Sequence, residues 1–208
     1  MVTEYSKEMC LYLLQNPELI EQETLTDYFE YHVFKSINDG ISRKLGTAPW
    51  RSRFALVSGD ENENEDTFFA KFEWPRRANG DDLVGFRLWE SDSGINEWWL
   101  SHVLGFRGGK LCFDFFVEGQ AGGPSKYKAK QMLEALFNKN EKIKKAGFVH
   151  HQRGSIYLPF TLDPAKVIEE FPKLHASLAP MFKALDDIMK LSDEFDAIVK
   201  EIYPEDQS

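Results

Sequence analysis

The residues with the widest chemical range are three histidines and one aspartate in the second half of the chain. His150 and His151 are adjacent, so a strand would direct them to opposite faces, and one metal ion could not take both as ligands. His102 and Asp114 lie in other predicted strands, where they could approach one histidine as metal ligands or as a general base. No spacing rule supports this combination. We therefore favour histidines that are satisfied within a sheet, and we expect no metal.

A glycine-rich segment, GQAGGPSK at 119–126, is the second candidate, because it lies between a predicted strand and a predicted helix. Its backbone amides could cradle an anion beside a helix N-terminus. Pro124 removes one amide donor, and the spacing of a Walker loop is absent. A plain connection is the favoured interpretation. The weaker alternative is an anion-binding loop of Gly122, Gly123, Ser125 and Lys126.

A group of tryptophans and arginines is the best candidate for binding. Arg87 and Trp89 are two residues apart, so they share one face of a predicted strand. A guanidinium beside an indole on an open sheet face would stack on a base, a sugar or a partner's side chain. Large aromatic residues on both faces favour the alternative, in which helices cover the whole sheet. The predicted binding residues are Arg87, Trp89, Trp98, Trp99 and Arg153.

Alternating apolar and polar residues predict the strands that would position these groups. The pattern indicates an antiparallel meander of about five strands. Gly108-Gly109 supplies a tight hairpin before the last of them, and a second hairpin crosses Arg153-Gly154. The meander strands are expected at 54–57, 68–74, 83–90, 98–106 and 110–117, and the hairpin strands at 148–152 and 155–160.

The C-terminal segment carries a seam of apolar residues spaced alternately three and four apart from 171 to 202. This period predicts helices, and Pro172 and Pro180 predict a short helix, a kink and a longer helix from about 180 to 203. We expect the seam to pack mainly on its own domain. Its last turns, with Phe195, Val199 and Ile202, are predicted to be free for a second copy, so the chain would be a monomer or a homodimer.

These elements predict a single α+β domain over residues 1–208. It would consist of a helical N-terminal segment, a sheet with an inserted lysine-rich helix, and a long kinked C-terminal helical region. The boundaries are 1–46 for the first, 53–160 for the sheet with the helix at 125–146, and 163–203 for the last.

The charge of the chain is unevenly distributed. The net charge is −9, and acidic residues concentrate in 1–30, 59–66 and 186–208, whereas 126–145 holds seven lysines and two glutamates. Overall acidity disfavours a general nucleic-acid binder, which requires a basic footprint. Two cysteines are too few for a disulfide framework, and no apolar run is long enough for a membrane helix. We expect a cytoplasmic protein without membrane contact.

No catalytic motif stands out, so the sequence favours a non-catalytic interaction or regulatory protein. An inhibitor or immunity-type binder would use the acidic surfaces to hold a partner protein, which would then be basic. We expect no cofactor. One alternative is an enzyme with an unrecognised histidine and aspartate site. Another is a nucleic-acid-associated accessory module that uses the lysine-rich helix, Arg51, Arg53 and the Trp/Arg sheet face.

Overall fold

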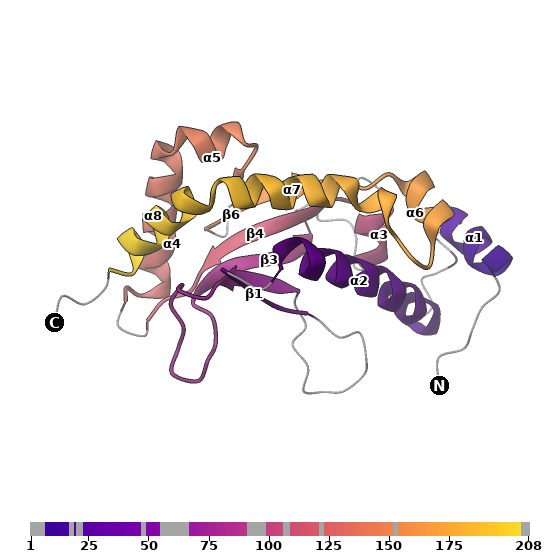
Figure 1. Ribbon diagram of the computed structural model, residues 1–208, viewed down its shortest axis with the longest axis horizontal. Helices are drawn as coiled ribbons and strands as arrows, with labels where there is room; N and C mark the ends of the chain where they lie inside the picture. Colours follow the sequence, from indigo (N-terminus) through magenta and orange to yellow (C-terminus); the bar gives the residue numbers. More distant parts are fainter. Residues whose placement is uncertain are drawn as a thin grey trace.

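The computed structural model describes residues 7–16, 19, 23–46, 49–54, 67–90, 99–105, 109–120, 123–151 and 154–204 (Figure 1). Their buried apolar side chains form one contiguous core. Within these residues, no helix is both long and apolar enough to cross a membrane.

The strands form one antiparallel sheet with the order β1-β2-β3-β4-β6-β5. Four consecutive strands make the meander, and the hairpin of β5 and β6 joins it because β6 pairs with β4. The α+β class is therefore confirmed. The strands are β1 (Trp50–Arg53), β2 (Phe68–Lys71), β3 (Val84–Glu90), β4 (Leu111–Val117), β5 (Val149–His151) and β6 (Ser155–Phe160).

Helices from both ends of the chain and from its middle pack around this sheet. In Figure 1, α7 and α8 run end to end along the sheet, while α4 crosses one end of it. The helices before β4 are α1 (Lys7–Gln15), α2 (Glu23–Leu45) and α3 (Trp99–Val103). Those after β4 are α4 (Lys126–Lys139), α5 (Glu141–Lys145), α6 (Pro164–Glu170), the 3₁₀ helix η3 (Ala176–Leu178), α7 (Ala179–Lys190) and α8 (Ser192–Ile202).

Phe195 of α8 is the centre of the contact between helices and sheet. Its ring is fully buried, with centroid distances of 4.9 Å to Phe86, 4.8 Å to Phe115 and 5.3 Å to Phe148. Such tilted and edge-on ring pairs are favourable beyond their buried area. These contacts place the side chains of Phe86 and Phe115 on the face of the sheet that α8 covers.

The apolar seam packs within the chain, as the sequence predicts. Phe195, Val199 and Ile202 are each at most 5% exposed. The expectation that these three residues are free for a second copy is therefore wrong, because the core of the same chain already covers them. A homodimer would require another surface.

The predicted strand at 98–106 is wrong, because the described residues 99–103 form the helix α3. Leu100, Val103 and Leu104 are all buried, and their i, i+3, i+4 spacing is that of a helix. Short apolar runs fit both periods, and the following Gly108-Gly109 favoured the hairpin interpretation. Residues 107 and 108 lie outside the described part of the chain.

The other differences concern element boundaries. The first strand is β1 at Trp50–Arg53 rather than 54–57, of which 55–57 lie outside the described residues. The predicted helix at 125–146 is broken at Asn140, whose side chain caps α5 by accepting from the backbone N–H groups of Lys142 and Ile143. The long C-terminal helix is likewise broken at Leu191 into α7 and α8.

Removing the Phe195 ring should destabilise the fold strongly. Phe195→Ala leaves a cavity among three other phenylalanines, and we expect a loss of about 3–5 kcal/mol in the free energy of unfolding. Phe72→Ala makes the same chemical change at a side chain that is 58% exposed, and it should cost less than about 0.5 kcal/mol. Urea unfolding followed by circular dichroism measures both. Equal losses would contradict the central role of Phe195.

Glu170 ties the end of α6 to the start of η3. Its carboxylate accepts hydrogen bonds from the backbone N–H groups of His175, Ala176 and Ser177 at 2.7–3.0 Å, and from the Ser177 hydroxyl at 2.7 Å. Partial desolvation raises the pKa of Glu170, but these four bonds outweigh it and lower the pKa from 4.5 to about 2. The charged carboxylate thus stabilises the folded state.

Glu170→Gln should lower stability at neutral pH by about 1–2 kcal/mol, because the amide accepts fewer of these bonds. The folded pKa is the lower one, so the stabilisation is complete above pH 4.5 and is lost as the pH falls towards about 2. The gap between the native chain and the variant should therefore close over that range. The neighbouring, exposed Glu169→Gln serves as control in the same pH series of urea unfolding. A gap that persists unchanged at low pH would refute this role.

Candidate functional site

The face of the sheet opposite α8 carries one row of side chains that crosses every strand. Arg53 pairs with Phe68, Phe68 with Arg87, Arg87 with Asp114, and Asp114 with Tyr157. Directly paired residues of antiparallel strands point to the same face. We call this the ladder face; the row ends at Val149 of β5, which pairs with Tyr157.

Two arginines of this face each lie against aromatic rings. The Arg53 guanidinium lies 5.0 Å from the centroid of Phe68, and that ring lies 5.7 Å from Phe116. The Arg87 guanidinium lies 5.2 Å from Phe116 and 4.5 Å from Trp89. These distances are within the range of cation–π attraction. We call the five residues the arginine–aromatic ladder.

Asp114 fixes the orientation of Arg87. Nε and Nη2 of Arg87 each lie 2.9 Å from Oδ2 of Asp114. The aspartate side chain is only 5% exposed, whereas that of Arg87 is 31% exposed. A buried carboxylate requires such a partner, since a lone charge there would be strongly destabilising. The pair thus buries its negative member and presents its positive member to solvent.

Gly85 makes room for this arrangement. A Cβ atom at Gly85 would lie 2.3 Å from Cε2 of Phe68, closer than any real contact. Gly85 pairs with Phe116 in the neighbouring strand, so the ring of Phe68 lies over the glycine and reaches Phe116. Glycine in the middle of β3 is therefore needed for the close approach of the two rings.

A pocket of about 160 Å³ adjoins the ladder at the end of β4. The start of α4 contributes Lys126 and Lys130 to its wall, and the strands contribute Arg87, Asp114, His151 and Tyr157. The His151 ring lies edge-on to Tyr157, with centroids 6.0 Å apart. The volume is that of about five water molecules, enough for one side chain or a small polar group.

Cys112 also lines this pocket, but it is a poor nucleophile. The residue is 2% exposed. Burial and the nearby charge of Asp114 raise the pKa of its thiol far above its usual value. The thiolate is the reactive form of cysteine, so the thiol remains protonated and unreactive.

The structure separates the histidines. His151 and Asp114 line the same pocket, whereas His150 points to the covered face and stacks on Phe137 at 6.3 Å. His102 lies buried in α3, with Nε2 3.1 Å from Oε2 of Glu90. In the described part of the chain, no group of three or more His, Cys, Asp or Glu side chains is arranged to hold a metal ion.

The remaining predicted binding residues divide as follows. Arg87 and Trp89 stand together, as expected. Trp98 and Arg153 lie outside the described residues, as does the side chain of Trp99.

In the glycine-rich segment, Ser125 caps α4 by accepting from Lys128 N–H, and Lys126 pairs with Glu118 at 2.7 Å. Gly122 lies outside the described residues. A Cβ at Gly123 would meet the Tyr203 ring at 2.7 Å, so this glycine has a packing role. The contacts seen in this segment are those of a structural connection.

Most acidic side chains of the C-terminal helices have partners within the chain. Asp186 pairs with Lys44 at 2.7 Å, and Asp187 pairs with Lys183 and Lys190. Glu194 is bonded to Asn140 and Lys142, and Asp196 to Lys71 and Trp74. The acidic segment 59–66 lies outside the described residues. Asp186, Glu194 and Asp196 thus join these helices to α2, α5 and β2, whereas the pairs of Asp187 lie within α7.

Two members of the ladder, Phe68 and Phe116, are not among the binding residues predicted from the sequence, whereas Arg53 is predicted only for the nucleic-acid alternative. Alternation within one strand shows which of its residues share a face. The register between strands determines which residues of neighbouring strands lie side by side on that face. Arg53 and Phe68 lie on strands whose pairing no local pattern specifies.

No protein-family model, curated protein or solved structure matches this chain.

Proposed function

We propose that this chain is a non-catalytic binding module that docks a short acidic segment of a partner protein on its ladder face. The observation that carries the proposal is that Arg87 is held in a fixed orientation and yet remains exposed to solvent. Its guanidinium is bonded to Asp114 and stacked on Trp89 and Phe116, yet its side chain is 31% exposed. Arginine and tryptophan dominate the energetics of protein interfaces. A side chain that is ordered before binding loses little entropy when a partner arrives.

The charge of the face favours an acidic partner. The side chains of Arg53 and Arg87 are 43% and 31% exposed, whereas those of their partners Asp82 and Asp114 are 5% exposed. The side chain of Lys126 is 58% exposed and that of its partner Glu118 is 29% exposed. In each of these pairs the cation is therefore more exposed than the carboxylate, although the whole chain is acidic. Complementary charge raises the rate of encounter and selects the partner. The pocket beside Arg87 is large enough for one carboxylate side chain, and its wall contains Lys126 and Lys130 as well as Glu90 and Glu118.

The aromatic rings and guanidiniums of the ladder also support a second candidate, a single-stranded nucleic acid. Bases stack on such platforms, and a basic groove follows the backbone. A net charge of −9 opposes a long polyanion more than a short acidic peptide, so we place the peptide first. The free cysteines Cys10 and Cys112 are consistent with the cytoplasm as the proposed location.

The experiment compares binding of three fluorescent probes by polarisation: a glutamate-rich peptide with one tyrosine, the same peptide with lysine for glutamate, and an oligothymidine. The native chain should bind the acidic peptide, and more weakly as salt is added. The double variant Arg87→Met, Asp114→Asn removes both charges, so no buried carboxylate is left without a partner. We expect it to bind at least about tenfold more weakly, which is about 1.4 kcal/mol.

Arg43→Met is the matched control, since Arg43 is an exposed arginine on α2, and its affinity should equal that of the native chain. Circular dichroism confirms that each variant is folded. Binding of the lysine peptide in preference to the acidic one would overturn the proposal. So would equal affinity of the double variant and the native chain. Preference for oligothymidine, lost in the double variant, would favour the second candidate instead.

A further inference from the structure

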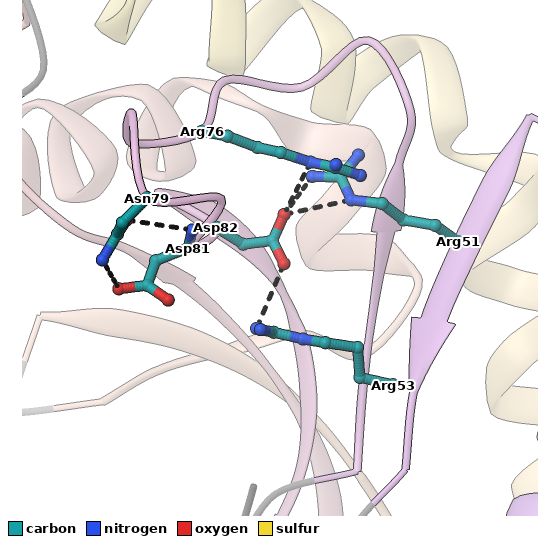
Figure 2. Close-up of polar contacts among 6 residues, drawn as sticks. All are labelled: Arg51, Arg53, Arg76, Asn79, Asp81 and Asp82. Atoms are coloured by element: carbon teal, nitrogen blue, oxygen red, sulfur yellow. Dashed lines mark hydrogen bonds and ion pairs between the residues drawn. The ribbon is translucent and has the colours of Figure 1, made fainter.

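The loop between β2 and β3 holds one carboxylate against three arginines at the edge of the sheet (Figure 2). Oδ1 of Asp82 accepts from Nε of Arg51 at 3.0 Å and also from its Nη2. Oδ2 lies 3.1 Å from Nη2 of Arg53, and Nε of Arg76 lies 3.4 Å from Oδ1. We call these four residues the arginine clasp.

The local backbone builds the clasp without a ligand. Arg51 and Arg53 are two residues apart on the edge strand β1, so they share a face. Arg76 and Asp82 are bridged across the loop, and Arg77 N–H donates to the carbonyl of Asp81 at 2.8 Å. The turn is closed by Asn79, whose side chain bonds to Asp81 at 2.7 Å, and by Gly80 with a φ of +91°. The arginines are therefore held together before any ligand binds.

The clasp carries more positive charge than its carboxylate can neutralise. Within the part of the chain that the structure describes, three guanidiniums surround one aspartate, which leaves a surplus of two positive charges. Burial lowers the pKa of Arg51. The hydrogen bond and the charge of Asp82 raise this pKa, and the charges of Arg76 and Arg53 lower it further, so the net shift is downward. Among the described residues, Nη1 of Arg51 has no hydrogen-bond partner, although the atom is buried. A buried donor without a partner lowers the free energy of unfolding, so this cluster contributes little to stability by itself.

We propose that the arginine clasp binds a doubly charged oxyanion, a phosphoryl group, through the N–H groups of Arg53 and Arg76 that Asp82 leaves free. The side chains of these two arginines are 43% and 40% exposed, so solvent reaches them. A phosphoryl group at neutral pH carries nearly two negative charges, which matches the surplus. Guanidinium forks suit phosphate oxygens because two parallel N–H groups meet two acceptors. A carboxylate would neutralise only half of the surplus.

This inference does not depend on the peptide site around Arg87, although Arg53 belongs to both the clasp and the ladder. The phosphoryl group could come from free phosphate or from a phosphorylated side chain. Both present the same oxygens, so the experiment includes a probe for each source.

Phosphate binding is measured by isothermal titration calorimetry at constant ionic strength, with inorganic phosphate and with a phosphoserine peptide as probes. The native chain should bind at least one of them. Arg76→Gln should weaken that binding at least about tenfold. Arg76 is chosen because its contact with Asp82 is the longest of the clasp and its side chain is partly exposed, so the variant should remain folded.

Arg77→Gln is the matched control. It removes the same charge from the adjacent exposed residue of the same loop and should leave the affinity unchanged. The glutamate form of the peptide separates the two sites, because it should bind the ladder face and not the clasp. Binding of inorganic phosphate alone assigns the site to free phosphate, and tighter binding of the phosphopeptide assigns it to a modified partner. The proposal is overturned if the native chain binds neither probe, or if Arg76→Gln binds as well as the native chain.

Discussion

The packing of α8 on the sheet is the contact on which the rest of the structure depends. Phe195 fills the space among Phe86, Phe115 and Phe148 with ring distances of 4.8–5.3 Å. Successive residues of a strand point to opposite faces. Once Phe86 and Phe115 are buried under α8, Arg87 and Asp114 must point the other way. The ladder face is therefore a direct consequence of where the C-terminal helix packs.

Polar contacts hold α8 in this position and explain the distribution of charge. Lys71 and Trp74 both donate to Asp196, and Asn140 and Lys142 both donate to Glu194. Beyond the helix, the Tyr203 hydroxyl donates to the carbonyl of Glu118. Burial is the main cause that raises the pKa of Tyr203 to about 12, and the negative charge of Glu118 adds to it. Two acids of α8, Glu194 and Asp196, thus have internal partners. Net charge alone is a poor guide to the charge that a partner meets.

The fold class and most elements follow from the sequence, and the failures have physical reasons. Period two located β3 and β4, and the apolar seam located the C-terminal helices. The segment at 98–106 failed because its short apolar run fits both periods and a Gly-Gly pair follows it. For the site, Arg87 and Trp89 were placed on one face by alternation alone. The pairing of Arg87 with Asp114 was not predicted, because the register between strands depends on contacts distant in sequence.

Asp82 and Asp114 both hold arginines in place through buried carboxylates. Their side chains are 5% exposed, whereas the side chains of Arg53 and Arg87 remain partly exposed. Replacing a buried ion pair by apolar residues of similar size is often neutral or stabilising, so such pairs contribute little to the fold itself. Their specific effect is orientation, since a carboxylate beneath a guanidinium fixes its plane and directs the unused N–H groups outwards. At Asp114 the oriented group is one arginine stacked on aromatic rings, which suits a single acidic side chain beside a pocket. At Asp82 it is three arginines around one carboxylate, which suits an anion of higher charge. The same arrangement, once within the sheet and once in a loop at its edge, thus supports the two proposed anion sites, which differ in the charge they prefer.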